Sequence, residues 1–169
     1  MMEIQPVPKP DFLSDEQWAM VLQSRSRAVQ GELGRSDAEL YKKTGGKGGK
    51  FESLGGTPLV ITVIGRKSGK ELTTMLFYMP DDENFVIVGS CAGLPEDPHW
   101  WKNLQANPHA WVQVNDRRFE VTARKATAEE RARLWPRIEQ KFPLWGHFQK
   151  HVEREFPVVI LSPDCIKES

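Results

Sequence analysis

Two segments of this sequence combine the residue types that bind an anionic ligand. Between two β-type runs, residues 65–70 read Gly-Arg-Lys-Ser-Gly-Lys, which offers cationic side chains and turn amides. Further along, residues 89–93 read Gly-Ser-Cys-Ala-Gly and lead into an expected helix. Glycines at 89 and 93 and the small Ser90 permit close backbone approach, and a helix N-terminus attracts negative charge. We therefore expect two walls of one site for a phosphate-bearing coenzyme.

The basic segment at 65–70 also has simpler interpretations. It is not a P-loop, because it lacks the glycine spacing and the Lys-Ser or Lys-Thr pair of that motif, and because it joins two expected strands. Exposed hairpin turns are commonly rich in Lys, Ser and Gly, so a solvated turn is the structural alternative.

The residue spacing supports metal and thiol chemistry less well than it supports an anion site. His147 and His151 lie one helical turn apart, but no glutamate stands between them in the metalloprotease arrangement and no third ligand is suggested, so we expect no metal. Cys91 lies just before a helix, where the helix dipole can lower a thiol pKa and favour a nucleophile. No base partner is visible in the sequence, so a small loop or pocket residue is the favoured interpretation and a nucleophile is the alternative.

An aromatic face recurs at spacing three in Phe142, Trp145 and Phe148. Plain core packing explains such a face. However, Pro143 and Gly146 interrupt the regular helix there, and an aromatic cluster at a broken element often lines a pocket. The second interpretation favours flat, apolar substrates.

Composition favours a single domain that handles small molecules. The chain has 169 residues, and 23 basic residues balance 23 acidic ones, so no global field attracts nucleic acid or an anionic membrane. No apolar run approaches the ~18 residues of a membrane span, and residues 1–10 do not resemble a secretory signal, so we expect a cytoplasmic protein. Cys91 and Cys165 are too few for a disulfide framework and are expected to be reduced.

The N-terminal part of the chain is expected to be a helical arm. Ser14 and Gln17 have the spacing of a capping box, and the helical pattern runs to about Lys43 with a break near Gly31 to Gly34. Residues 45–50 are rich in Gly and Lys and suggest a flexible linker, either a boundary or a lid hinge. We therefore divide the chain into an arm with its linker, 1–50, and a main domain, 51–169.

The main domain is expected to be α+β and mainly antiparallel. Most of its strands are joined by hairpin turns, whereas a parallel sheet needs helical crossovers, so a barrel or sandwich with peripheral helices is favoured. Asp97 is the expected N-cap of a helix that starts at Pro98 and ends at Gln105, and Thr127 with Glu130 caps a later helix that ends at Phe142. A further helix is expected at 144–154. The expected strands are 59–64, 72–79, 85–88, 110–114, 118–123 and 157–161.

From about Thr57 to Pro163 the chain resembles the deazaflavin-dependent nitroreductase family, which uses coenzyme F-420. The resemblance rests on residues 65–69, the segment 89–101, Asn-Leu-Gln-Ala-Asn-Pro at 103–108, and Ala-Arg-Lys-Ala-Thr at 123–127 with Glu-Glu-Arg at 129–131. It implies a six- or seven-stranded split β-barrel of the FMN-binding split-barrel type. It also implies an oxidoreductase that transfers hydride from reduced F-420 to a planar electrophile such as a quinone, an activated enone or a nitroaromatic.

The resemblance also implies roles for individual residues. The coenzyme phosphate and acidic tail would lie near Arg66, Lys67 and Lys70, and Phe142, Trp145 and Phe148 match the substrate-side tyrosines of the best-known members. Ser90 is the first candidate to hydrogen-bond the acceptor or the ring, with Tyr78, Cys91 and His147 as further candidates for proton delivery. The full coenzyme set is Arg66, Lys67, Ser68, Gly69, Lys70, Thr73, Thr74, Met75, Val88, Gly89, Ser90, Cys91, Gly93, Trp100, Trp101 and Asn103.

One departure from the family pattern keeps alternatives open. Cys91 stands where the family's loop usually has a lysine, which removes one cation from the coenzyme site. The alternatives are an FMN-dependent split-barrel enzyme and a non-catalytic protein that binds F-420 or an apolar ligand. The expected partner is a small-molecule acceptor, with no nucleic acid and no spanning membrane segment, and a homodimer stays open.

Overall fold

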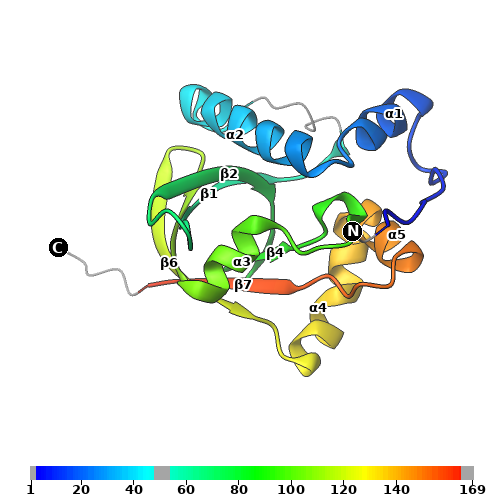
Figure 1. Cartoon of the computed structure of the whole chain (residues 1–169). Coiled ribbons are helices and arrows are strands. Elements are labelled where there is room, and N and C mark those ends of the chain that lie inside the picture. Colours follow the sequence, from blue (N-terminus) through cyan, green and yellow to red (C-terminus); the bar gives the residue numbers. More distant parts are fainter. Residues whose placement is uncertain (1–2, 48–53, 165–169) are drawn as a thin grey trace.

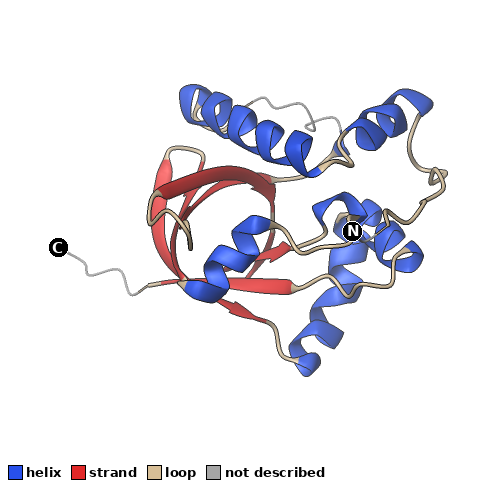
Figure 2. Ribbon diagram, viewed as in Figure 1, coloured by secondary structure: helices blue, strands red, loops and turns tan. Residues whose placement is uncertain are grey.

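The protein folds as one curled antiparallel sheet with helices around it, as a computed structural model of residues 3–47 and 54–164 shows (Figure 1). Seven strands pair in the order β2-β1-β5-β6-β7-β4-β3 and form a curled half-barrel (Figure 2). This confirms the expected α+β split-barrel fold. The elements are α1 (Asp15–Gln23), α2 (Arg27–Thr44), β1 (Pro58–Ile64), β2 (Glu71–Phe77), β3 (Met79–Asp81), β4 (Asn84–Val88), the short 3-10 helix η2 (Cys91–Gly93), α3 (His99–Ala106), β5 (His109–Val114), β6 (Arg117–Lys125), α4 (Ala128–Lys141), α5 (Pro143–His151) and β7 (Val158–Pro163).

Hairpin turns set the register of the sheet where the sequence predicts them. The β1–β2 turn closes with the Gly65 amide donating to the Lys70 carbonyl at 2.8 Å, and Gly69 takes a left-handed φ of 69°. The β5–β6 turn places Asn115 at a φ of 55°, a conformation that asparagine tolerates. Because side chains alternate across each strand, one face of β1, with Leu59, Ile61 and Val63, fills the barrel core.

The N-terminal arm packs on the barrel rather than standing apart from it. Trp18 and Val21 of α1 lie in the same apolar cluster as Phe148, and Tyr41 of α2 packs with Val60 of β1. The Tyr41 hydroxyl accepts a hydrogen bond from the Asn115 amide at 2.7 Å. The arm is thus fixed to both the helical layer and the sheet. Part of the expected linker, residues 48–50, lies outside the described residues.

Several element boundaries differ from the sequence prediction. α2 is continuous through Gly31 and Gly34, and the helical break lies earlier, between α1 and α2, where Ser26 caps α2. The expected strand 72–79 is two strands, β2 and β3, divided at Tyr78. The helix expected at 144–154 is α5, which ends at His151.

Helix α3 begins one residue later than predicted, and Asp97 is not its N-cap. Pro98 occupies the cap position, and it has no side-chain group to bond the first helical amides. The Asp97 carboxylate instead accepts a 2.6 Å hydrogen bond from the Arg154 guanidinium. The Asp97 side chain therefore bonds Arg154 and not the first amides of the helix.

Candidate functional site

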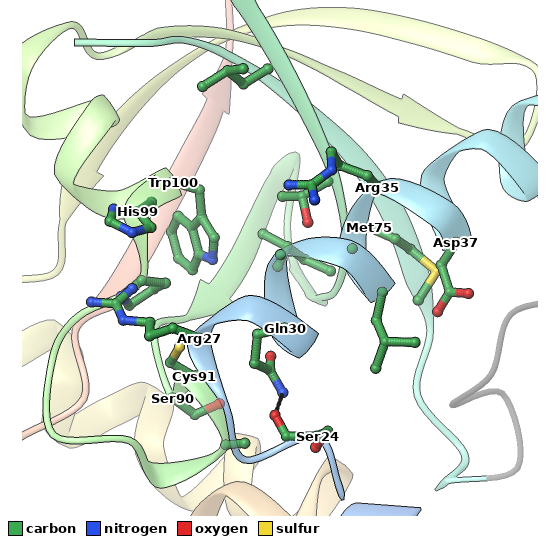
Figure 3. A pocket seen from close by; sticks show the side chains of 18 of the residues that line it. Ser24, Arg27, Gln30, Arg35, Asp37, Met75, Ser90, Cys91, His99 and Trp100 are labelled. Carbon is green, nitrogen blue, oxygen red and sulfur yellow. Dashed lines mark hydrogen bonds between the residues drawn. The ribbon is translucent and has the colours of Figure 1, made fainter. Parts of the chain in front are cut away.

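A cavity of about 520 Å³ lies between the arm and the barrel (Figure 3). It is bounded by α2, the β1–β2 hairpin, the loop after β4, the start of α3 and the start of α5. The two predicted walls therefore meet at one cavity. Of the residues expected at the coenzyme or the acceptor, those that line it are Arg66, Lys67, Ser68, Thr73, Thr74, Met75, Val88, Ser90, Cys91, Trp100, Asn103, Trp145 and Phe148.

The first wall is the basic turn, and α3 holds it in place. The buried Asn103 side chain accepts hydrogen bonds from the Arg66 amide at 3.1 Å and from the Arg66 guanidinium at 2.7 Å. Arg66 Nη2 also lies 3.3 Å from His99 Nδ1. Two elements distant in the sequence, the hairpin and α3, are thereby joined at the cavity, and Asn103 positions the turn.

The second wall is the loop after β4, and two arginines hold its backbone. Arg154 donates to the carbonyls of Gly89, Ser90 and Leu94 at 2.8 to 3.0 Å. From the arm, Arg25 donates to the Ala92 carbonyl at 2.8 Å. Within this loop Cys91 and Ala92 both take left-handed φ values, 46° and 50°, which cost about 1 kcal/mol each for residues with a Cβ. The arginine bonds offset that cost and fix Ser90 and Cys91 at the cavity.

The cavity carries a positive field at its hairpin end. The pKa of His99 is lowered, first by burial and then by the charges of Arg27, Arg66, Lys102 and Lys67. Since a guanidinium can only donate, its contact with His99 Nδ1 also requires that nitrogen to be unprotonated. A neutral histidine among cations indicates a place where a negatively charged group is favoured.

Another part of the cavity lining is apolar and aromatic. Trp145 and Phe148 reach it from α5, and Met75 and Val88 reach it from the sheet. Phe142 does not line it, because its ring is buried behind Trp145, with centroids 4.4 Å apart, and stacks on Phe77. The predicted aromatic face is thus divided between cavity wall and core.

Comparison with known proteins identifies the family. The model of the F420H(2)-dependent quinone reductase family matches residues 33–163. The chain belongs to this family. F420H(2)-dependent quinone reductase Rv1261c of Mycobacterium tuberculosis is 33% identical over 141 residues, which cover 80% of this chain and 93% of the relative.

Solved structures agree with the family. One described as the structure of an F420-H2 dependent reductase, FDR-A, is 31% identical with a TM-score of 0.58, and the match covers 62% of this chain and 93% of that chain. Another, described as a domain-swapped dimer, has the same identity and TM-score and is covered over 79% of its length. As a member of the quinone reductase family, the chain is an oxidoreductase enzyme whose cofactor is coenzyme F-420.

The cavity residues fit the cofactor of this quinone reductase family. Phosphate and carboxylate groups need cations, which Arg66 and Lys67 of the hairpin turn offer. A planar ring needs an apolar surface, which the lining residues Val88 and Val63 offer, together with Leu72, the strand partner of Val63 on the same face of the hairpin. Among the described residues, no helix is both long and apolar enough to cross a membrane.

The pKa of the Cys91 thiol shifts in the direction opposite to the one that a helix dipole would cause. Burial raises the pKa of Cys91, and the charges of Arg27 and Arg154 only partly oppose that effect. The expectation of a lowered pKa is therefore wrong, because desolvation of the thiolate outweighs the nearby positive charge. Cys91 is a neutral thiol on the cavity wall.

Several expected site residues lie elsewhere. A Cβ on Gly89 would meet Pro157 at 2.6 Å, and one on Gly93 would meet Phe148 at 2.8 Å, so these glycines serve close packing within the protein. Tyr78 packs edge-on against Phe85 at the barrel core, and burial raises its pKa. The cavity lining also lacks Gly69, Lys70, Trp101 and His147, whose Nε2 lies 2.6 Å from the Pro8 carbonyl.

The sequence prediction missed the contribution of the arm to the cavity. Arg27, Gln30, Arg35 and Asp37 of α2 all line it, and Figure 3 shows them around the same cavity as Met75, Cys91 and His99. Arg27 also donates to the Glu96 carboxylate at 2.8 Å and to the Asp97 carbonyl at 2.7 Å. The signal in the sequence was Gly34 in α2, which permits close approach of the helix to the sheet at Thr74.

Proposed function

We propose that this enzyme reduces quinone-type acceptors with reduced F-420, and that nitroaromatics and activated enones are further acceptors. The proposal is carried by one observation: a single cavity has four basic side chains toward its hairpin and arm side and an aromatic wall from α5. The cations are Arg27, Arg35, Arg66 and Lys67. A phosphate-bearing deazaflavin and a flat acceptor require these two kinds of surface together.

The bound coenzyme supplies the hydride, and the protein supplies position and electrostatics. Arg66 and Lys67 bind the coenzyme's anionic groups, with Arg66 held ready by Asn103. The β2 backbone at Thr73, Thr74 and Met75 forms the floor under the ring, because the three side chains alternate between the two faces of the strand. Because Arg66 is already anchored, little side-chain entropy is lost when the anion binds.

On the acceptor side, Trp145 stacks against the planar substrate, because Phe148 lines the cavity but its side chain is only 2% exposed. Ser90, 8% exposed at the cavity wall, donates its hydroxyl hydrogen bond to the acceptor oxygen or the ring. Cys91 is the secondary proton donor, since its thiol is neutral. α2 covers the site and excludes water, which strengthens each of these polar contacts.

Arg27 supplies the cation that Cys91 removes from the family's loop. Its charge acts on the Cys91 thiol, and both side chains line the cavity. The arm therefore carries a charge that relatives with lysine in the loop carry on the barrel. The anion site therefore keeps its positive charge, but the charge comes from α2 and not from the loop after β4.

The experiment that tests the proposal is binding of F-420 and FMN to the purified apoprotein, followed by single-turnover oxidation of reduced F-420 with a quinone. Tight F-420 binding and quinone-dependent oxidation are expected. Replacing Arg66 and Lys67 together by Ala should weaken F-420 binding by at least about tenfold and reduce its salt sensitivity. Lys125→Ala, an exposed charge outside the cavity lining, is the matched control.

Three results would overturn parts of this proposal. Tight FMN binding with no F-420 binding favours the FMN-dependent alternative. Tight F-420 binding without oxidation by any of the three acceptor classes favours a binding protein. An unchanged dissociation constant in the Arg66 and Lys67 variant refutes the anion site. Sedimentation of the same sample tests whether the chain forms a homodimer, which the sequence leaves open.

A further inference from the structure

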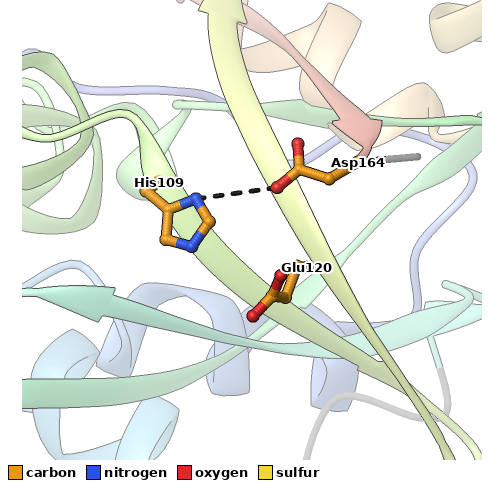
Figure 4. A group of neighbouring side chains, drawn as sticks. All are labelled: His109, Glu120 and Asp164. Atoms are coloured by element: carbon orange, nitrogen blue, oxygen red, sulfur yellow. Dashed lines mark ion pairs between the residues drawn. The ribbon is translucent and has the colours of Figure 1, made fainter. Parts of the chain in front are cut away.

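Three side chains with metal-binding atoms meet on the sheet away from the cavity. His109 begins β5, Glu120 lies in β6, and Asp164 directly follows β7 (Figure 4). One ligand atom from each lies within 4.8 Å of the other two. None of the three lines the cavity of the proposed function, so a role for them is independent of the coenzyme.

The sheet register brings these residues together on its outer face. His109 pairs with Thr122, and Trp111 pairs with Glu120, so His109 and Glu120 are diagonal neighbours on adjacent strands. The Asp164 amide donates to the Glu120 carbonyl at 2.8 Å, which extends the β6–β7 ladder by one residue. Since the alternate positions Ala110 and Val121 are fully buried, His109 and Glu120 face away from the core.

The carboxylate of Asp164 is oriented toward the imidazole. Thr122 donates its hydroxyl to Asp164 Oδ1 at 2.8 Å. The other oxygen, Oδ2, lies 3.7 Å from His109 Nδ1. A hydrogen bond that fixes the far oxygen of a carboxylate is the usual support of a metal ligand.

We propose that His109, Glu120 and Asp164 bind a divalent transition metal of the zinc class. One imidazole and two carboxylates are ligands that Zn²⁺ accepts, and the two negative charges neutralise the ion. Bonds of about 2.0 to 2.2 Å place ligand atoms about 3.4 Å apart, so side-chain rotations bring the three atoms inward. His109 and Asp164 side chains are 44% and 37% exposed, which leaves a path for the ion and a fourth position for water.

The site differs from the histidine pair that the sequence makes visible. Of that pair, His147 contacts the Pro8 carbonyl. The three residues proposed here are dispersed along the chain, and only the pairing of β5, β6 and β7 joins them. A metal bound there would link three neighbouring strands and stabilise the folded state by mass action.

The test is titration of the full apoprotein with Zn²⁺ by calorimetry and with Co²⁺ by absorption and tryptophan fluorescence. The ring centroids of His109 and Trp111 are 5.2 Å apart, so bound Co²⁺ should quench Trp111, and Trp111→Phe should remove that quenching while keeping the absorption band. One equivalent of metal should bind, and Zn²⁺ should raise the midpoint of thermal unfolding. His109→Ala, Glu120→Gln and Asp164→Asn should each weaken binding by at least about tenfold, and Thr122→Val by about tenfold.

His147→Ala with His151→Ala is the matched control, and it should leave binding unchanged. Circular dichroism of each variant without metal shows that its fold is retained. The proposal is overturned if wild-type protein shows no saturable binding of either metal. It is equally overturned if binding survives all three ligand substitutions, or is lost only in the histidine control or in Cys165→Ser.

Discussion

Arg154 Nη1 lies 2.6 Å from the Asp97 carboxylate, and the same guanidinium donates to backbone carbonyls at both ends of the loop between β4 and α3. The loop begins at Gly89 and carries Ser90 and Cys91. Burial lowers the pKa of Arg154, and the adjacent Asp97 opposes that shift. One side chain from the segment after α5 therefore fixes the backbone of the second cavity wall.

Replacing Arg154 by Ala should destabilise the fold and loosen the site. Three carbonyls and the Asp97 carboxylate lose a charged donor, and losing hydrogen bonds to a charged group in a partly buried site of this kind costs about 2 to 3 kcal/mol. We expect a lower free energy of unfolding in urea titrations and weaker F-420 binding. Arg154→Lys should recover only part of the loss, because an ammonium does not match the fork of a guanidinium.

Asp97→Asn separates the contribution of the ion pair from that of the hydrogen bonds to the backbone carbonyls. It keeps a hydrogen-bond acceptor for Arg154 but removes the charge, and the three backbone carbonyls still hold the guanidinium. Its cost in the free energy of unfolding should therefore be smaller than that of Arg154→Ala. Equal costs would mean that the ion pair, and not the backbone bonds, organises the loop.

The β1–β2 and β5–β6 hairpins could be predicted because their turn residues and strand patterns are local. The two basic and small-residue segments also met at one cavity as expected. Arg154 and Arg25 could not be predicted, because they bind backbone carbonyls, which carry no sequence signature. Asn103 was expected at the coenzyme, but the structure shows that its oxygen already holds Arg66.

The sequence predicts a helical break at Gly31 to Gly34, and tertiary packing explains why that prediction is wrong. Gly lowers helix propensity, so Gly31 and Gly34 suggest a break when only local sequence is considered. In the structure a Cβ on Gly34 would lie 2.1 Å from Thr74 Oγ1, so this glycine permits close contact between α2 and β2. Tertiary packing outweighs propensity, and the helix joins the cavity wall.

The two glycines of α2 should respond to substitution with opposite signs. Gly34→Ala should destabilise the protein by about 1 to 3 kcal/mol, because the new methyl group meets Thr74 and pushes α2 from the sheet. Gly31→Ala should stabilise it by up to about 1 kcal/mol, since its Cβ meets only the flexible end of Arg35 at 3.3 Å. Thermal and urea unfolding measure both.

A second substitution distinguishes steric contact from helix propensity. Thr74→Ala removes the oxygen that the Gly34→Ala methyl meets, while the Thr74 Cβ lies at a tolerable 3.3 Å from the place that this methyl would occupy. The double variant should therefore lose less free energy of unfolding than the two single variants lose when their losses are added. Simple additivity would show that Gly34 does not act through Thr74.

Arg27→Ala should weaken F-420 binding by about tenfold and lower its salt sensitivity, because one of the cavity's cations is lost. Cys91→Lys in that background should restore part of the binding if Arg27 replaces the family's lysine. Fluorescence titration at two salt concentrations measures both effects. Glu96→Gln is the control, since it removes the ion-pair partner of Arg27 but leaves the cation in place. Loss of binding in Glu96→Gln equal to that in Arg27→Ala would assign Arg27 a purely structural role.

Asp81 makes the stability of the fold depend on acid pH. Two arginines of α4 bind its carboxylate: Arg133 through both oxygens at 3.1 and 3.2 Å, and Arg137 at 2.8 Å. These bonds lower the pKa of Asp81 to about 2, although burial opposes them. Because the folded pKa lies below the unfolded value of about 3.9, the stabilisation is present above pH 4 and is lost as pH falls toward 2.

Asp81→Asn should therefore cost about 1 to 2 kcal/mol at pH 7, a figure reduced from the full shift because both arginines are about half exposed and screened by water. The difference between wild type and variant should shrink steadily as pH falls from 4 and disappear only below pH 2, because half of the folded molecules still carry the Asp81 charge at the folded pKa of about 2. Urea unfolding at a series of pH values measures it. Asp116→Asn, in the exposed β5–β6 turn, is the control and should show no such trend. A pH-independent difference for Asp81→Asn would attribute its effect to packing between β3 and α4 and not to charge.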